Sequence, residues 1–205
     1  MKKKLPGILI LASGAFLCLS LATGAMAADL AAGCSGCHGT DGVSTDPNSP
    51  TIAGASAAYH TATLNDYKKK ERPCGEVVIT AGDKKGTKSD MCKVLADVSA
   101  ADIEQLAKTF SAKKFVRFKQ TVDAAAAAKG KDINDKLCGA CHSEGGSVAD
   151  DDAGILAGQP LAYLKAQLDA YKAGKRSGPT KMKPKFDSLQ AADLDALAQY
   201  YASFK

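Results

Sequence analysis

Apolar residues recur with helical spacing in two segments, one near the middle of the chain and one at its C-terminal end. The two sets are Ile103, Leu106, Ala107 and Phe110, and Leu194, Leu197, Ala198 and Tyr201. Each set follows the order i, i+3, i+4 and i+7, which is typical of a helix that buries one face. Ser99 and Asp102 precede the first set with the spacing of a capping box. We therefore predict an amphipathic helix in each segment.

The rest of the pattern also favours helices. We expect them over residues 56–72, 122–138 and 160–174, with a short leading helix over 28–33. No segment alternates apolar and polar residues convincingly, so no strand is predicted. Residues 112–122 are expected to form a connection. The sequence therefore predicts an all-α fold.

The first 27 residues have the features of a secretory signal peptide. A basic start is followed by an apolar stretch from Ile8 to Leu21, and Ala25-Met26-Ala27 is a small-x-small cleavage site. An uncleaved anchor is the alternative. No later stretch is apolar for long enough to span a membrane. We therefore expect a periplasmic protein that begins at Ala28 and has no membrane span after cleavage.

The charge of the chain argues against nucleic-acid binding. The formal net charge of +5 includes three lysines of the predicted signal peptide, so residues 28–205 carry +2. The basic residues are spread along the chain and form no basic arm, which makes nucleic acid a poor partner.

The chain contains two related halves. At an offset of 104 residues the matching pairs include Tyr59 and Tyr163, Leu64 and Leu168, Tyr67 and Tyr171, and Arg72 and Arg176. The offset then falls to 91, at which Met91 matches Met182, so the first half carries a 13-residue insertion between Arg72 and Met91. An internal repeat of this kind indicates duplicated structural units. We predict two tandem domains, over 28–112 and 123–205, with a linker over 113–122.

Four of the six cysteines after the predicted signal peptide form two copies of Cys-x-x-Cys-His. The copies are Cys34, Cys37 and His38, and Cys138, Cys141 and His142. This is the attachment signature of c-type haem, in which two thiols reach the vinyl groups of one porphyrin and the histidine lies under the iron. A redox dithiol would not require the histidine, and zinc would need tetrahedral sets of ligands. We therefore expect two covalently bound haem c groups.

Two methionines are the candidates for the sixth iron ligands. Only Met91 and Met182 remain after the predicted signal peptide, and each follows its haem motif, by 53 and 40 residues. A core-filling role is the alternative for either one. Ligation by His38 and Met91, and by His142 and Met182, would raise the reduction potential. It would also fill both axial positions, which favours outer-sphere electron transfer over oxygen chemistry.

Cys74 and Cys92 are the two remaining thiols. In an exported protein they are expected to form a disulfide, which would hold Met91, next to Cys92, over the first haem. Closing a loop of 17 residues would contribute roughly 3 kcal/mol to stability. The alternative is that one of the two thiols ligates the first iron as a thiolate.

One histidine lies outside the haem motifs. His60 has Leu164 as its repeat partner, so it does not belong to the shared scaffold. We expect His60 on a helix surface. A proton-linked or partner-binding role and iron ligation are the alternatives.

Lysines flank both methionines. They are Lys84, Lys85, Lys88 and Lys93 near Met91, and Lys181, Lys183 and Lys185 around Met182. Lysines around a haem edge would steer an acidic redox partner. The alternative is that they are ordinary solvated residues.

The chain resembles a two-domain class I cytochrome c over residues 28–205. More closely, it resembles the dihaem cytochrome subunit of flavocytochrome c sulfide dehydrogenase, with cytochrome c4 as a looser relative. The closer match is carried by His142-Ser143-Glu144-Gly145-Gly146 and by Asp-Asp-Ala-Gly-Ile-Leu-Ala-Gly-Gln over 151–159. Cytochromes c4 usually have glycine after the histidine and proline before Leu-Ala-Gly, where this chain has Ser143 and Gly154.

The resemblance implies an electron-transfer subunit that is not an enzyme by itself. It also implies docking onto an FAD-containing, sulfide-oxidising flavoprotein, with a downstream cytochrome or oxidase as acceptor. In the broader family a proline carbonyl orients the haem histidine. Pro50 fits that role, and Gly154 is expected to offer the same carbonyl in the second half. A freestanding cytochrome c4-like shuttle is the main alternative, ahead of a dihaem enzyme with its own substrate site.

Overall fold

The structure is a computed structural model that describes the backbone of residues 22–205 and the side chains from residue 30 onward. Residues 1–21, most of the predicted signal peptide, lie outside the described residues. Helix α1 (Ala22–His38) runs through the predicted cleavage site after Ala27, so the leading helix expected over 28–33 is part of a longer one. Among the described residues, no helix is both long and apolar enough to cross a membrane.

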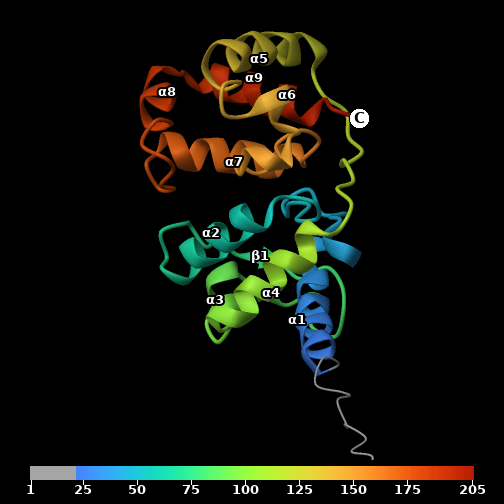
Figure 1. The fold of residues 1–205 in the computed structure, drawn as a ribbon. Helices are drawn as coiled ribbons and strands as arrows, with labels where there is room; N and C mark the ends of the chain where they lie inside the picture. Colours follow the sequence, from blue (N-terminus) through green and yellow to red (C-terminus); the bar gives the residue numbers. More distant parts are fainter. Residues whose placement is uncertain (1–21) are drawn as a thin grey trace, which may run out of the picture.

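Two helical groups follow one another along the chain (Figure 1). The first contains α1, the 3-10 turn η1 (Thr40–Gly42), α2 (Ala57–Lys68), α3 (Met91–Leu95) and α4 (Ala100–Ser111). The second contains α5 (Ala124–Leu137), α6 (Ser143–Gly146), η2 (Ala149–Asp151), α7 (Leu161–Lys172), α8 (Lys183–Ser188) and α9 (Ala191–Ala202). Residues 113–123 connect the groups without helix or strand. The predicted helical architecture is confirmed.

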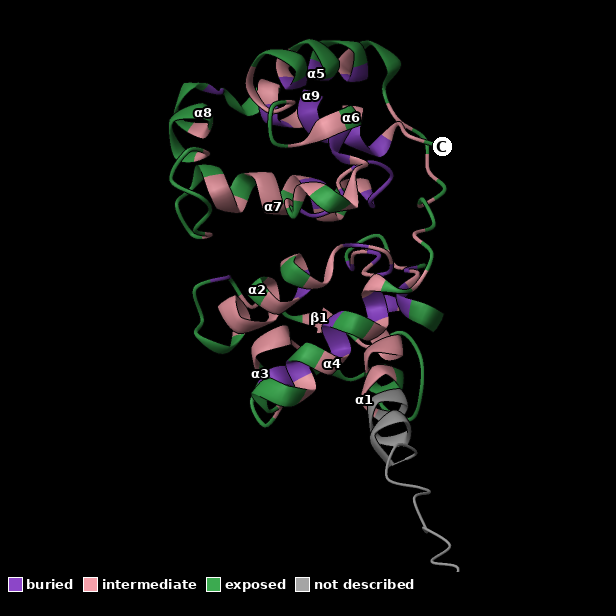
Figure 2. Ribbon diagram, viewed as in Figure 1, coloured by how far each residue is buried: buried purple, intermediate pink, exposed green. Residues whose placement is uncertain are grey.

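The two amphipathic helices form the centre of their groups, as predicted. All the apolar positions that define the pattern in α4 and α9 are buried (Figure 2). Ser99 and Asp102 make the expected capping box, in which each side chain accepts a hydrogen bond from the other residue's backbone N–H. Helix α4 packs on α1 and α2, and α9 packs on α5 and α7. The repeated sequence pattern therefore produces the same central element twice.

The insertion contains a small strand pair that the sequence pattern did not predict. Strands β1 (Val77–Val78) and β2 (Lys88–Ser89) are antiparallel, with Val77 opposite Ser89. Two residues are too few to show an alternating pattern, so the prediction of no strand was wrong here. The pair lies between Arg72 and Met91, in the part of the first half that has no counterpart in the second.

A buried amide joins the two groups. The Gln159 side-chain N–H donates to the Thr51 carbonyl at 2.8 Å, and the Thr51 backbone N–H donates to the Gln159 side-chain carbonyl at 2.9 Å. Gln159 and Thr51 are both almost fully buried. In addition, the backbone N–H of Tyr163 donates to the Pro47 carbonyl. These contacts fix the second group against the first, so the site between them has a defined shape.

Candidate functional site

A large cavity connects the two halves. Its volume is about 2050 Å³, and its wall contains the cysteines and histidines of both Cys-x-x-Cys-His motifs together with Met91 and Met182. Pockets for one drug-sized ligand usually measure about 300–1,000 Å³. The cavity therefore has room for two large groups, and every residue predicted to attach or ligate a haem faces it.

The first motif lies on the last turn of α1. Cys34 and Cys37 are free thiols, and burial raises the pKa of Cys34 to about 11. His38 is buried, and its Nδ1 lies 2.9 Å from the Pro50 carbonyl. An Nδ1–H that donates to this carbonyl leaves Nε2 free to ligate a metal, and burial lowers the pKa of His38, which keeps the ring neutral. The predicted role of Pro50 as the acceptor for His38 is confirmed.

The second motif follows α5 and is held differently. Nδ1 of His142 is buried and has no hydrogen-bond partner among the described residues. The expectation that Gly154 would offer its carbonyl was therefore wrong. Gly154 has a φ of 76°, which proline cannot adopt, and a Cβ at this position would lie 2.5 Å from Cζ of Tyr59. The ring of Tyr59, from the first half, thus requires glycine where the first half has proline.

Both methionines begin or precede a short helix. Met91 is the first residue of α3, and Met182 is the N-cap of α8. Neither short helix was predicted from the sequence, since each is too short for a periodic pattern. Both side chains are half-buried and line the cavity. The structure therefore brings each methionine to the same cavity as the histidine with which it was paired.

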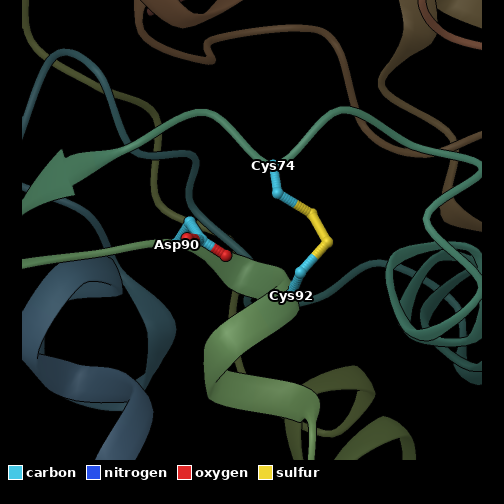
Figure 3. A group of neighbouring side chains, drawn as sticks. All are labelled: Cys74, Asp90 and Cys92. Carbon is cyan, nitrogen blue, oxygen red and sulfur yellow. A yellow bond between two sulfur atoms is a disulfide. The ribbon is translucent and has the colours of Figure 1, made fainter.

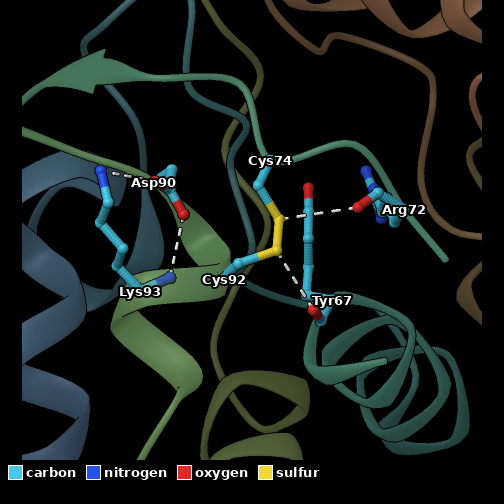
Figure 4. Close-up of a disulfide and its surroundings, with 6 residues drawn as sticks. All are labelled: Tyr67, Arg72, Cys74, Asp90, Cys92 and Lys93. Atoms are coloured by element: carbon cyan, nitrogen blue, oxygen red, sulfur yellow. Dashed lines mark hydrogen bonds and ion pairs between the residues drawn. A yellow bond between two sulfur atoms is a disulfide. The ribbon is translucent and has the colours of Figure 1, made fainter. Parts of the chain in front are cut away.

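A disulfide joins Cys74 to Cys92, with their Cα atoms 5.7 Å apart. The predicted disulfide is confirmed, and neither sulfur is free to act as a thiolate ligand. Figure 3 shows Asp90 beside the bridge, but the bonded sulfurs cannot hold a metal ion with it. Asp90 instead accepts a hydrogen bond from the backbone N–H of Lys93 at 2.9 Å and caps α3 (Figure 4). The bridge and the cap together position the helix that starts at Met91.

Two arginines at equivalent repeat positions meet between the halves. Arg72 is buried, donates to the Tyr163 hydroxyl at 2.9 Å and to Gln167 at 3.2 Å, and leaves its Nε without a partner. Arg176 donates to the same Gln167 oxygen at 2.7 Å and stacks on Tyr171. No ion pair of the described residues involves either arginine.

Burying a guanidinium without an anion is costly. Burial raises the pKa of Tyr59, yet the charges of Arg72 and Arg176, together with side-chain hydrogen bonds to Thr63 and Arg72, lower it to about 8. Both arginines line the cavity. The carboxylates of the haem propionates would supply the anions that fit these two arginines. The sequence repeat contained Arg72 and Arg176 but did not indicate this role.

His60 is not on a helix surface, which corrects the prediction. It is buried, lines the cavity and packs against Phe110, and its Nε2 has no partner among the described residues. Burial lowers its pKa to about 4, so the ring is neutral at pH 7. Its repeat partner, Leu164, is equally buried. An apolar residue at the repeat position was the signal that could have revealed this burial.

The comparisons with known proteins agree with this geometry. A family model described as "Cytochrome C oxidase, cbb3-type, subunit III" matches residues 125–200. Cytochrome c4 from Stutzerimonas stutzeri is 34% identical, and the match covers 82% of each chain. A "Thiosulfate dehydrogenase electron acceptor" from the same species is 29% identical over 83% of this chain and 78% of its own length.

Solved structures of cytochrome c4 and of a thiosulfate dehydrogenase also resemble this chain. Reduced recombinant cytochrome c4 from Pseudomonas stutzeri matches with a TM-score of 0.70 and 29% identity, covering 88% of this chain and 98% of the other. A thiosulfate dehydrogenase from Marichromatium purpuratum matches with a TM-score of 0.65 and 27% identity. That match covers 83% of this chain but 36% of the dehydrogenase chain.

Proposed function

We propose a function from the premise that this chain belongs to the cytochrome c4 family of dihaem electron-transfer proteins. In this proposal the chain is a periplasmic carrier that accepts electrons from a sulfur-compound dehydrogenase and passes them to a downstream cytochrome or oxidase. The observation that carries it is the shared cavity, whose wall contains all the residues predicted to bind the two haems. The disulfide and the predicted signal peptide support an oxidising compartment.

We infer the following roles for the residues of the cavity. Cys34 and Cys37, and Cys138 and Cys141, form the thioether bonds, while His38 with Met91 and His142 with Met182 ligate the two irons. Haem c supplies reversible one-electron chemistry between Fe(III) and Fe(II). We also propose 28–112 and 123–205 as the two domains and 113–122 as their linker.

The protein contributes orientation and charge. Pro50 holds the His38 ring through Nδ1, so its Nε2 points away from the carbonyl. Arg72 and Arg176 offer positive charge to the propionates. Ligation of each iron by a histidine and a methionine would leave no coordination site for a substrate, which supports electron transfer as the function of this chain alone.

The comparisons favour a thiosulfate dehydrogenase as the electron donor. One relative carries the printed name of an electron acceptor for that enzyme, and a second match lies within a longer thiosulfate dehydrogenase chain. The flavin subunit of a sulfide-oxidising flavocytochrome c is the second candidate. It is supported by the residues after His142 and by Gly154, which differ from the usual cytochrome c4 pattern.

A donor assay separates the two candidates. The oxidised holoprotein is mixed with a thiosulfate dehydrogenase and thiosulfate, or with a flavocytochrome c flavin subunit and sulfide, and haem reduction is followed by absorbance. We expect rapid reduction in the first mixture, and a rate that falls as salt rises. Co-elution of haem and flavin from the native extract would instead support the flavocytochrome subunit. No reduction by either dehydrogenase would overturn the proposed donor class.

A further inference from the structure

We propose that electron exchange with partner proteins takes place at the second Cys-x-x-Cys motif, because the insertion covers the first. The inference rests on the proposed electron-transfer function and deepens it by assigning an entry and exit point. The partner is a one-electron redox protein with an acidic surface around its own redox centre. The two thioether bonds attach each motif to the rim of a porphyrin, so a segment that covers the motif also shields that rim.

The tip of the insertion is hydrogen-bonded to the first motif. The Gly36 carbonyl, between Cys34 and Cys37, accepts from the Thr80 backbone N–H at 2.8 Å and from the Thr80 hydroxyl at 3.0 Å. The backbone N–H of Ala81 donates to the same oxygen at 3.2 Å. The Ile79 side chain lies so close that a Cβ on Gly36 would be 3.0 Å from it. The insertion therefore packs closely against Gly36 in the first motif.

The second motif has no such cover. Between Arg176 and Met182 the second half has five residues, where the first half has the inserted strand pair. Ala140, which stands at the repeat position of Gly36, is exposed, and so is Cys141. Residues 34–37 are all half-buried by contrast. The second Cys-x-x-Cys motif is therefore more exposed to solvent than the first, although the two motifs have the same pattern.

The charges near the second motif indicate an acidic partner. Lys136, Lys181 and Lys185 are exposed, line the cavity and make no ion pair among the described residues. The charge of Lys185 acts on the Cys138 thiol, which places it near the motif. Asp135, the acidic neighbour, is paired with Lys131. Lysines without ion pairs beside an exposed haem-attachment motif attract and orient an anionic surface.

Two of the lysines beside the first motif are compensated. Lys88 pairs with Glu76 at 2.9 Å, and Lys93 pairs with Asp90 at 3.0 Å. Lys84 and Lys85 make no ion pair among the described residues, but as a pair they directly follow Asp83, which carries the opposite charge. The insertion over the first motif and the paired lysines beside it therefore both favour docking of a partner at the second half.

The test uses hexacyanoferrate(III), a small anionic oxidant that takes one electron from each reduced haem and becomes hexacyanoferrate(II). The fully reduced holoprotein is mixed with it at low salt and followed by stopped-flow absorbance. In Lys136→Glu/Lys185→Glu we expect the second-order rate constant to fall at least about fivefold, since steering by a charged surface changes association rates by an order of magnitude or more. The matched control, Lys84→Glu/Lys85→Glu, should stay within about twofold of the wild type.

A second variant opens the first motif. Residues 80–86 are replaced by Gly-Gly. The hydrogen-bonded residues Ile79 and Thr87 then lie on either side of a two-residue hairpin turn. Placed in the Lys136→Glu/Lys185→Glu background, this change should restore the oxidation rate severalfold because a second edge becomes accessible. Unchanged haem spectra and disulfide content would show that the variant is folded.

Equal effects of the two lysine pairs, or no recovery on opening the first motif in a folded variant, would overturn the inference. Failure of the proposed function is distinguishable, because haems that cannot be reduced and reoxidised reversibly would give no oxidation in any variant, wild type included.

Discussion

Single residues differ between the halves at positions where the repeat pattern aligns them. Proline at position 50 accepts a hydrogen bond from His38, whereas glycine at position 154 makes room for Tyr59 and leaves Nδ1 of His142 unpaired among the described residues. Likewise, a buried histidine at position 60 stands opposite a buried leucine at position 164. The two haem sites thus have the same predicted ligands and differ in the residues around them.

His60 should make stability depend on pH in the acid range. Its pKa falls from the ordinary 6.5 to about 4 on folding, so below pH 6.5 the unfolded chain binds a proton that the folded chain does not. Stability contributed by the neutral ring is complete above pH 6.5 and is lost as the pH falls toward 4. The His60→Leu variant places the residue of the repeat partner, Leu164, at this position. Measured by urea unfolding, the free energy of unfolding should fall between pH 7 and pH 5 by about 2 kcal/mol less in His60→Leu than in the wild type.

An equal loss of stability in wild type and His60→Leu would contradict this account. His60→Gln serves as the control for a polar residue that does not titrate in this range. It should lose the same part of the pH dependence, although its stability at pH 7 need not match that of the leucine variant.

Arg72 should raise the reduction potential of the haems by opposing the positive charge of oxidised iron. Replacing Arg72 with Gln removes a buried charge that contacts both halves. The reduction potentials should therefore fall, and the equilibrium constant for haem reduction should decrease several-fold. Spectroelectrochemical titration of the holoprotein measures this shift. Arg117→Gln is the matched control, since Arg117 is exposed and stacks on Phe204. Equal shifts in both variants would mean that Arg72 acts only through the net charge.

At the scale of elements, the insertion combines a disulfide, a strand pair and the start of α3. Cys74→Ser/Cys92→Ser should reduce the unfolding free energy of the first half by roughly 3 kcal/mol, because the unfolded chain gains the entropy of an open loop. It should also weaken the Met91 ligation, which a loss of the methionine-to-iron absorption band would report. Unchanged stability in chemical denaturation would show that the hairpin holds its shape without the bridge.

The whole molecule depends on two cofactors buried in small helical units. Each half has fewer than 90 residues, and a unit of that size has a limited apolar core. Cys138→Ser/Cys141→Ser should therefore leave one covalent haem and a destabilised second half, while the first half keeps its spectrum. Intact mass spectrometry counts the haems, and thermal unfolding should show an added, earlier transition. A mass with two covalent haems would contradict the assignment of these cysteines.

Features that depend on neighbouring residues or on a repeat could be predicted from the sequence. The Cys-x-x-Cys-His motifs, the order of histidine and methionine, the duplicated amphipathic helices and the insertion were all readable from the chain. Thioether attachment needs a spacing of three residues, and a helix needs a period of 3.6, so both leave local patterns. The pairing of Cys74 with Cys92 followed because two thiols remained in a chain expected to be exported.

The surroundings of these sites could not be predicted in this way and follow from tertiary packing. The contacts of Thr80 with Gly36, Arg72 with Tyr163 and Tyr59 with Gly154 join segments that are far apart in the chain. No local pattern records such contacts, because they follow from how the two halves pack on each other. The burial of His60 and the unpaired Nδ1 of His142 have the same origin. A repeated sequence thus predicted two equal sites, and packing between and around the halves made them unequal.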